Sequence, residues 1–231
     1  SATTGFQSFY GDLWAKGETE KLRKSFESLV WTIHTSVVFV FGCVAVLIVP
    51  FVKVYTFGVN DADYDVPLFA LLITLAYAAY CIRLPYNLMV LAGNHYKQTQ
   101  KSYIIATALN IVVSVITVKI YGLIGVATGT LISMLYQTVW MAYYNDKNLV
   151  QWPFKEFVKQ TFVDIISFVP PYMICLMYSL NSYSYAMWVI LAIKVAVTWI
   201  VWIVLVNFLF YRSKLSAILG RLTKKKIVLN K

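Results

Sequence analysis

The stretch VPLFALLITLAYAAYCIRLPYNLMVLAGNHYKQTQK, Val66 to Lys101, is apolar over a long run and then becomes polar and basic. A helix needs about 20 mostly apolar residues to cross a bilayer. The first part therefore predicts a membrane-spanning helix over Val66–Leu91, and the second part predicts a basic loop. One residue, Arg83, breaks the apolar pattern and has to be explained.

The composition of the whole chain supports a membrane location. Of the 231 residues, 60% are hydrophobic and only 13% are charged, which is too little polar surface to cover a soluble globule. Cys43, Cys81 and Cys175 are far apart in apolar runs and form no CxxC spacing, so neither a disulfide framework nor a metal site is indicated. We therefore expect an all-α integral membrane protein.

Further apolar runs of spanning length surround this stretch. The predicted spans are Leu29–Val54, Val66–Leu91, Tyr103–Tyr121, Leu123–Tyr144, Thr161–Leu180 and Tyr185–Tyr211. Only Gly122 separates the third span from the fourth, and only NSYS separates the fifth from the sixth. Such short connections favour antiparallel neighbours, so we expect about six transmembrane helices in an up-and-down bundle.

The distribution of basic residues predicts the orientation. Sixteen of the 20 Lys and Arg residues fall in the leader, in two alternate loops and in the tail, which places these segments on the cytoplasmic side. Both termini are then cytoplasmic, and the acidic loop 55–65 is outside. The chain begins with Ser and has no signal peptide before its first apolar run, so we expect a fragment; the alternative is that residues 1–28 form a complete amphipathic leader.

Arg83 is the most informative of the remaining basic residues. Pro85 lies two positions further on and frees a backbone carbonyl, while Tyr86 and Asn87 offer hydrogen bonds beside it. This combination fits a water-filled cavity in which a guanidinium pairs with a phosphate or a carboxylate. The alternative, that Arg83 extends to the cytoplasmic headgroups, stays equally open.

Lys194 lies near the middle of its predicted span, where a lysine costs at least about 2.5 kcal/mol. Asp164 on the neighbouring span is too close to the cytoplasmic face for a simple ion pair, so Lys194 is expected to face a cavity, a lipid phosphate or an absent segment. His34 is either a proton relay or, as we favour, a hydrogen-bonded packing residue. Pro170 and Pro171 are expected to kink the fifth span as a hinge, as Pro85 does in the second.

Several stretches resemble one family. They are YGDLWAKGETEKLRKSF (10–26), PFVKVYTFGVNDADY (50–64), CIRLPYN (81–87), GNHYKQTQKSYIIATALNIVVSV (93–115) and YGLIGVATGTLISMLYQTVWMAYY (121–144). In this order they resemble the C-terminal half of bacterial polysaccharide flippases of the O-antigen or capsule type, within the multidrug/oligosaccharidyl-lipid/polysaccharide exporter superfamily. The resemblance covers about Ser1 to Lys147, and the last two spans match by hydropathy only.

The resemblance implies a two-lobed transporter, with six helices in each lobe around a cavity, that carries undecaprenyl-pyrophosphate-linked oligosaccharide outward for surface polysaccharide biosynthesis. Residues 1–28 would be a cytoplasmic leader containing the end of a truncated helix, 29–144 four helices of the second lobe, 145–211 two accessory helices and 212–231 a basic cytoplasmic tail. The N-terminal lobe would be missing. Arg83, Tyr86 and Asn87 would line the cavity, with Arg83 facing the pyrophosphate or acidic sugars.

The expected partners are thus the lipid-linked oligosaccharide, membrane lipids and the missing lobe, in the bacterial cytoplasmic (inner) membrane. We expect no enzyme activity, catalytic residue, cofactor, metal or nucleic acid. An integral-membrane polysaccharide polymerase or ligase is an alternative, but no catalytic set of residues converges in the sequence. A cation-coupled multidrug exporter is another, although the intramembrane charges are mostly positive.

Overall fold

Helices form because lipid offers no hydrogen-bond partner to the backbone, so each apolar run must satisfy its own N–H and C=O groups. The computed structural model describes residues 2–59, 64–180, 182–212 and 214. In this part of the chain, seven helices follow one another: α1 (Ala2–Ala15), α2 (Thr19–Tyr55), α3 (Pro67–Ala92), α4 (Tyr96–Tyr121), α5 (Leu123–Asn148), α6 (Phe154–Cys175) and α7 (Tyr185–Phe210).

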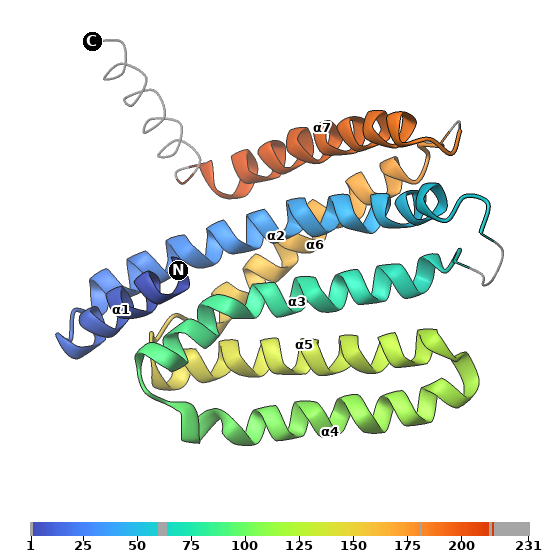
Figure 1. Cartoon of the computed structure of the whole chain (residues 1–231). Helices are drawn as coiled ribbons and strands as arrows, with labels where there is room; N and C mark the ends of the chain where they lie inside the picture. The colour runs from blue at the N-terminus through green and yellow to red at the C-terminus, as the bar shows by residue number, and fades with distance from the viewer. Residues whose placement is uncertain (1, 60–63, 181, 213, 215–231) are drawn as a thin grey trace, which may run out of the picture.

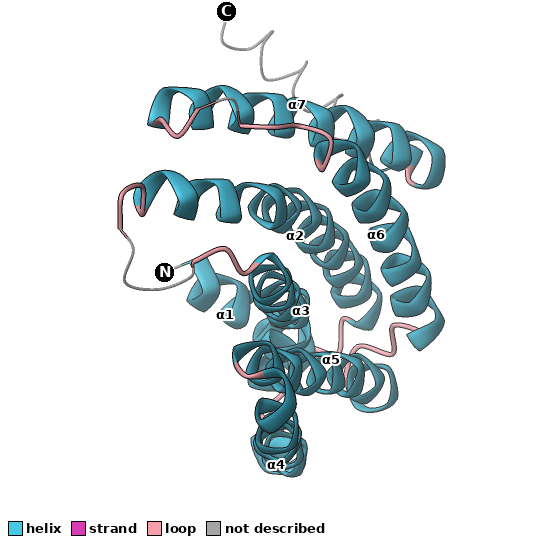
Figure 2. Cartoon of the chain, turned by 90° about the vertical axis from the view of Figure 1, so that its right-hand side faces the viewer, coloured by secondary structure: helices cyan, strands magenta, loops and turns pink. Residues whose placement is uncertain are grey.

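The helices lie side by side in the order α7, α2, α3, α5 and α4, from top to bottom in Figure 1. From α2 onward, each helix runs back along the bundle relative to the helix before it in the chain. Helix α6 crosses obliquely and contacts α2, α5 and α7. The end-on view in Figure 2 shows the same order. This arrangement agrees with the predicted up-and-down bundle.

Five of the described helices are long and apolar enough to cross a membrane, namely α2, α3, α4, α5 and α7. The sequence predicted about six spans, and the predicted span that is not among these five is Thr161–Leu180. The exception is α6, which contains Lys155, Glu156, Lys159 and Asp164 within 22 residues. It also lies nearer the N-terminus than the predicted span Thr161–Leu180, because it begins at Phe154 and ends at Cys175.

Two further helices begin earlier than their predicted spans. Helix α2 begins at Thr19, so the last part of the predicted leader 1–28 continues directly into the apolar run. Helix α4 begins at Tyr96 and includes the polar stretch before Tyr103. In both cases polar residues extend the helix beyond its apolar part. Charged and polar residues with good helix propensity continue the backbone hydrogen bonds even where the surroundings are not apolar.

Two hydrophobic cores lie along α2. The first surrounds its N-terminal half and joins α1, α2, α3, α5 and α6 through buried residues that include Tyr10, Phe26 and Tyr86. The second surrounds the other half and joins α2, α6 and α7 around the fully buried Trp199. Helix α7 is therefore attached through α2 and α6, and it has no contact with α3 among the described residues.

The connection between α4 and α5 requires a glycine. Gly122 has a φ of 55° and a ψ of −129°, a backbone conformation that is open to glycine and costly for other residues. Its N–H also bonds the carbonyl of Val118 and ends α4. This single residue reverses the chain, as the sequence predicted, and brings α4 and α5 together along their length (Figure 1).

Candidate functional site

Arg83 is buried on α3, with 6% of its surface exposed. Its guanidinium lies over the ring of Tyr80, one turn earlier on the helix, at 5.1 Å from the ring centre. Its Nε atom is buried without a hydrogen-bond partner, and none of the described carboxylates forms an ion pair with it. Arg83 is thus a buried cation, and its guanidinium lies against an aromatic ring and not against a described carboxylate.

Asn87 lies one turn beyond Arg83 on α3 and lines two grooves. The first has a volume of about 480 Å³ between the end of α3 and the start of α4. The second has a volume of about 450 Å³ between α1, α2 and α3. Tyr103 of α4 donates a hydrogen bond to Asn87 Oδ1 at 3.2 Å and lies within electrostatic range of Arg83. Arg83 itself lines neither groove.

Tyr86 does not line either groove, although the resemblance placed it in a cavity. Its ring is fully buried in the first core. It forms edge contacts with Phe26 at 5.5 Å and with Phe157 at 5.9 Å between ring centres. The backbone explains the difference, because residues 86 and 87 are about 100° apart around a helix and face different neighbours.

Lys194 is not brought together with Arg83. It is an exposed residue of α7 and lines a separate groove of about 230 Å³ with the segment that follows α6, including Tyr178 and Ser179. Tyr178 forms a hydrogen bond of 2.9 Å with Thr198, one turn beyond Lys194. Lys194 therefore lies beside polar groups of a connecting segment, and it forms no ion pair with Asp164, as expected.

The predicted hinge prolines all lie inside helices. Pro85 is within α3, and Pro170 and Pro171 are within α6. The helical structure continues through each of them, so their role as hinges stays a prediction. The basic tail, 212–231, lies outside the described residues apart from Arg212 and Lys214, and so do residues 60–63 of the predicted outer loop, which include Asp61 and Asp63.

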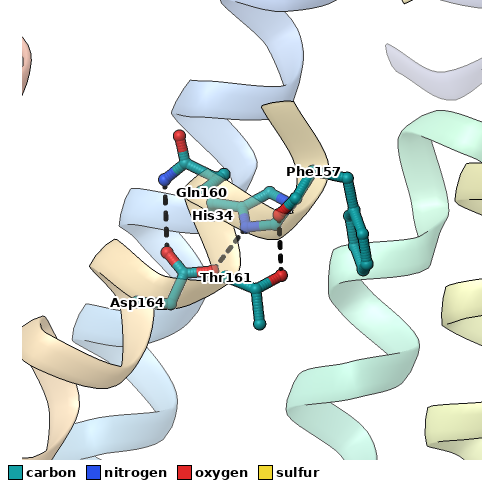
Figure 3. Close-up of polar contacts among 5 residues, drawn as sticks. All are labelled: His34, Phe157, Gln160, Thr161 and Asp164. Atoms are coloured by element: carbon teal, nitrogen blue, oxygen red, sulfur yellow. Dashed lines mark hydrogen bonds and ion pairs between the residues drawn. The ribbon is translucent and has the colours of Figure 1, made fainter. Parts of the chain in front are cut away.

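A second polar cluster, whose partners the sequence did not reveal, lies between α2 and α6 (Figure 3). His34 Nδ1 of α2 is 2.5 Å from Asp164 Oδ2 of α6. Gln160 Nε2, one turn earlier on α6, donates to Asp164 Oδ1 at 3.2 Å. The predicted hydrogen bond of His34 is thus present. The signal in the sequence was a histidine and an aspartate in separate apolar runs, but it did not identify them as a pair.

No family model, curated protein or solved structure matches this chain. Among the described residues, no group of three or more His, Cys, Asp or Glu side chains is arranged to hold a metal ion. What the fold supports directly is a helical protein with membrane-spanning segments. Its function has to be argued from the sites themselves.

Proposed function

We propose that this chain is part of a membrane transporter that moves an anionic, lipid-linked oligosaccharide across the bacterial cytoplasmic membrane. The observation that carries the proposal is Arg83, a buried cation in a spanning helix that forms no ion pair with a carboxylate of the described residues. Ionisable residues inside spanning segments are costly, and they mark substrate or ion pathways. An anionic ligand would supply the charge that the chain itself does not.

The groove between the end of α3 and the start of α4, which Asn87 lines, offers groups that suit such a ligand. It is lined by Tyr96, Lys97, Thr99, Gln100 and Tyr103 together with Asn87 and apolar residues. Lys97 adds a second positive charge, and the hydroxyl and amide groups can bond sugar hydroxyls. Asn87 and Tyr103, which line this groove, are bonded to each other, and Tyr103 lies within electrostatic range of Arg83.

The same groove fits a cationic drug poorly. Neither of the two grooves that Asn87 lines has an Asp or Glu among its described lining residues. A cation-coupled exporter of cationic compounds would need such a carboxylate to balance the charge of its substrate. The charge of this region therefore supports the anionic lipid over the multidrug alternative.

The proposal is tested by binding of undecaprenyl pyrophosphate to the purified chain in lipid nanodiscs. We expect Arg83→Ala to weaken binding by about 2 kcal/mol or more, because a hydrogen-bonded charge pair is lost. Lys119→Ala is the matched control, since Lys119 is an exposed cation at the far end of α4. Equal affinity of Arg83→Ala and the unmodified chain would disprove the assignment of Arg83.

A further inference from the structure

Lys194 lies inside the apolar part of the membrane. Trp199 packs against Gly42, which is in the middle of the apolar run of α2, so Trp199 marks the middle of the membrane on α7. Lys194 is five residues closer to the start of α7, about 8 Å along the helix axis, whereas half of the hydrocarbon core is about 15 Å thick. A lysine at this depth is costly unless polar groups surround its ammonium.

Helix α6 ends before it has crossed the membrane. Phe168 of α6 packs on Trp199 with 5.4 Å between ring centres, and only seven more residues follow before α6 ends at Cys175. Seven helical residues span about 10 Å, which is less than the remaining half of the core. The described residues 176–180, which follow α6 without continuing the helix, therefore lie at membrane depth.

This segment is attached to α7 at Lys194 by a chain of hydrogen bonds. The Thr198 hydroxyl donates to the backbone carbonyl of Lys194 at 2.9 Å. The single proton of Thr198 is then used, so the Tyr178 hydroxyl is the donor in its bond of 2.9 Å to Thr198 Oγ1. Tyr178 thus holds the segment beside the turn of α7 that contains Lys194.

A mainly polar groove of about 230 Å³ lies between the segment and α7, with Tyr178, Ser179 and Lys194 in its lining. Lys194 forms no ion pair with a described residue. Neither the hydroxyl nor the backbone N–H of Ser179 bonds to another described residue. Non-helical backbone at membrane depth occurs only where it is buried in protein or lines a water-filled cavity. These groups therefore need water or a polar ligand as their partner.

The lining of the groove defines the class of ligand. An ammonium and a hydroxyl both donate hydrogen bonds to an anion, and no Asp or Glu is among the described lining residues. Met177 and Ile190 also line the groove, and 84% and 46% of their surfaces are exposed. A ligand that satisfies both kinds of lining is anionic at one end and apolar at the other.

We propose that this groove binds the phosphate group of a membrane lipid, with Lys194 as its charge partner and Ser179 as a hydrogen-bond donor. The lipid chains lie along the exposed apolar residues of α7. The site is separate from Arg83, because α7 and α3 lie on opposite sides of α2 (Figure 1) and have no contact among the described residues. The inference therefore does not depend on the proposed function.

The first test measures the charge and the water content of the groove in the purified full chain in nanodiscs. Ser179→Cys is introduced into a variant whose native cysteines are alanine. A negatively charged thiol reagent should react with it about fivefold faster or more than a positively charged reagent of the same size, because Lys194 attracts the anion. Lys194→Gln should remove this preference. Ile193→Cys, an exposed apolar position on the same turn as Lys194, is the control and should react with neither reagent.

The second test identifies the lipid by native mass spectrometry of the full chain released from detergent. Phosphatidylglycerol, undecaprenyl phosphate and diacylglycerol, which has no phosphate, are offered at equal concentrations. Lys194→Gln should lower the retention of a phosphate lipid by about fivefold or more and leave that of diacylglycerol unchanged. Lys119→Gln, at an exposed cation at the end of α4, should change neither.

The lipid whose retention depends on Lys194 identifies the source of the phosphate. If Ser179→Cys stays unreactive or reacts equally with both reagents, the groove is not a hydrated anion site and the proposal is overturned. It is also overturned if Lys194→Gln retains each lipid as the unmodified chain does.

Discussion

The indole ring of Trp199 on α7 lies directly against the backbone of Gly42 on α2. A Cβ atom at position 42 would be 2.3 Å from two ring carbons of Trp199, a distance that no stable contact allows. Trp199 is fully buried and is the largest side chain of the second core. The absence of a side chain at Gly42 thus allows α7 to dock on α2.

Gly42→Ala should destabilise the chain, because the indole would have to leave its position in a closely packed core. Overpacking of this kind costs about 1–3 kcal/mol. Thermal unfolding in detergent, followed by circular dichroism, measures the effect. Gly5→Ala in α1 is the matched control, since no atom lies within 4 Å of its Cβ position, and it should stabilise its helix by up to about 1 kcal/mol. Unchanged stability of Gly42→Ala would mean that Trp199 does not hold α7 in place.

Gly125→Ala should separate α4 from α5. Its Cβ would lie 2.4 Å from the carbonyl carbon and oxygen of Thr117, so the backbone of α4 has to move. Because α4 contacts the rest of the described chain mainly through α5, we expect hydrogen exchange in α4 to speed up at least about tenfold while α2 stays protected.

The control for this experiment is Ile132→Ala on the exposed face of α5. It removes exposed apolar surface and adds no atom against α4, so exchange in α4 should stay close to that of the unmodified chain. Close approach through small residues is a common way for helices to associate in membranes. Normal protection of α4 in Gly125→Ala would show that α4 is held by other contacts.

Substitutions of Arg83 should separate ligand binding from structure in an export assay normalised to protein level. If Arg83 binds phosphate with its planar fork, Arg83→Lys keeps the charge but should reduce export, and Arg83→Ala should reduce it further, by about tenfold or more, at normal abundance. If Arg83 only extends to the headgroups, lysine should serve equally well. Loss of abundance in both variants would assign it a structural role on Tyr80, and export at the normal level by Arg83→Ala would refute the binding site.

The orientation of the bundle can be tested with a cysteine at the predicted outer loop. The turns before α2, α4 and α6 lie at one end of the bundle, together with the end of α7 (Figure 1). The basic residues of these segments predict that this end is cytoplasmic. An impermeant thiol reagent added outside intact cells should therefore label Asn60→Cys and leave Asn94→Cys unlabelled. The reverse pattern would invert the topology.

The spans that the sequence predicted well are those defined by local features. Val66–Leu91 and Tyr185–Tyr211 differ from α3 and α7 by one residue at most at each end. Pro67 is favourable at the start of α3, and the Ser184 hydroxyl accepts a hydrogen bond from the Met187 N–H at the start of α7. A long apolar run with a start signal of this kind is enough to predict a membrane helix, because the run and the signal both act within one segment of the chain.

The prediction was poorest where charged residues continue a helix or where partners come from distant segments. The span Thr161–Leu180 was placed too far along the chain, because apolar residues outweighed the charged first turns of α6. Asn87 was expected beside a cavity and lines two grooves. Tyr86, its neighbour in sequence, is buried instead in a core with aromatic residues from α2 and α6.

By itself, the sequence determined that this chain is a helical membrane protein, that Gly122 reverses it, and that Arg83 is a charge in an apolar helix. The spans and the exceptional place of Arg83 follow from the free energy of transferring residues into lipid, summed along one segment at a time. The reversal at Gly122 follows from the single residue between two spans. Only the tertiary structure decided that His34 meets Asp164 across 130 positions, and that Gly42 meets Trp199. Helices in a membrane associate through side-chain packing and hydrogen bonds on particular faces, and the choice of faces depends on all the helices together.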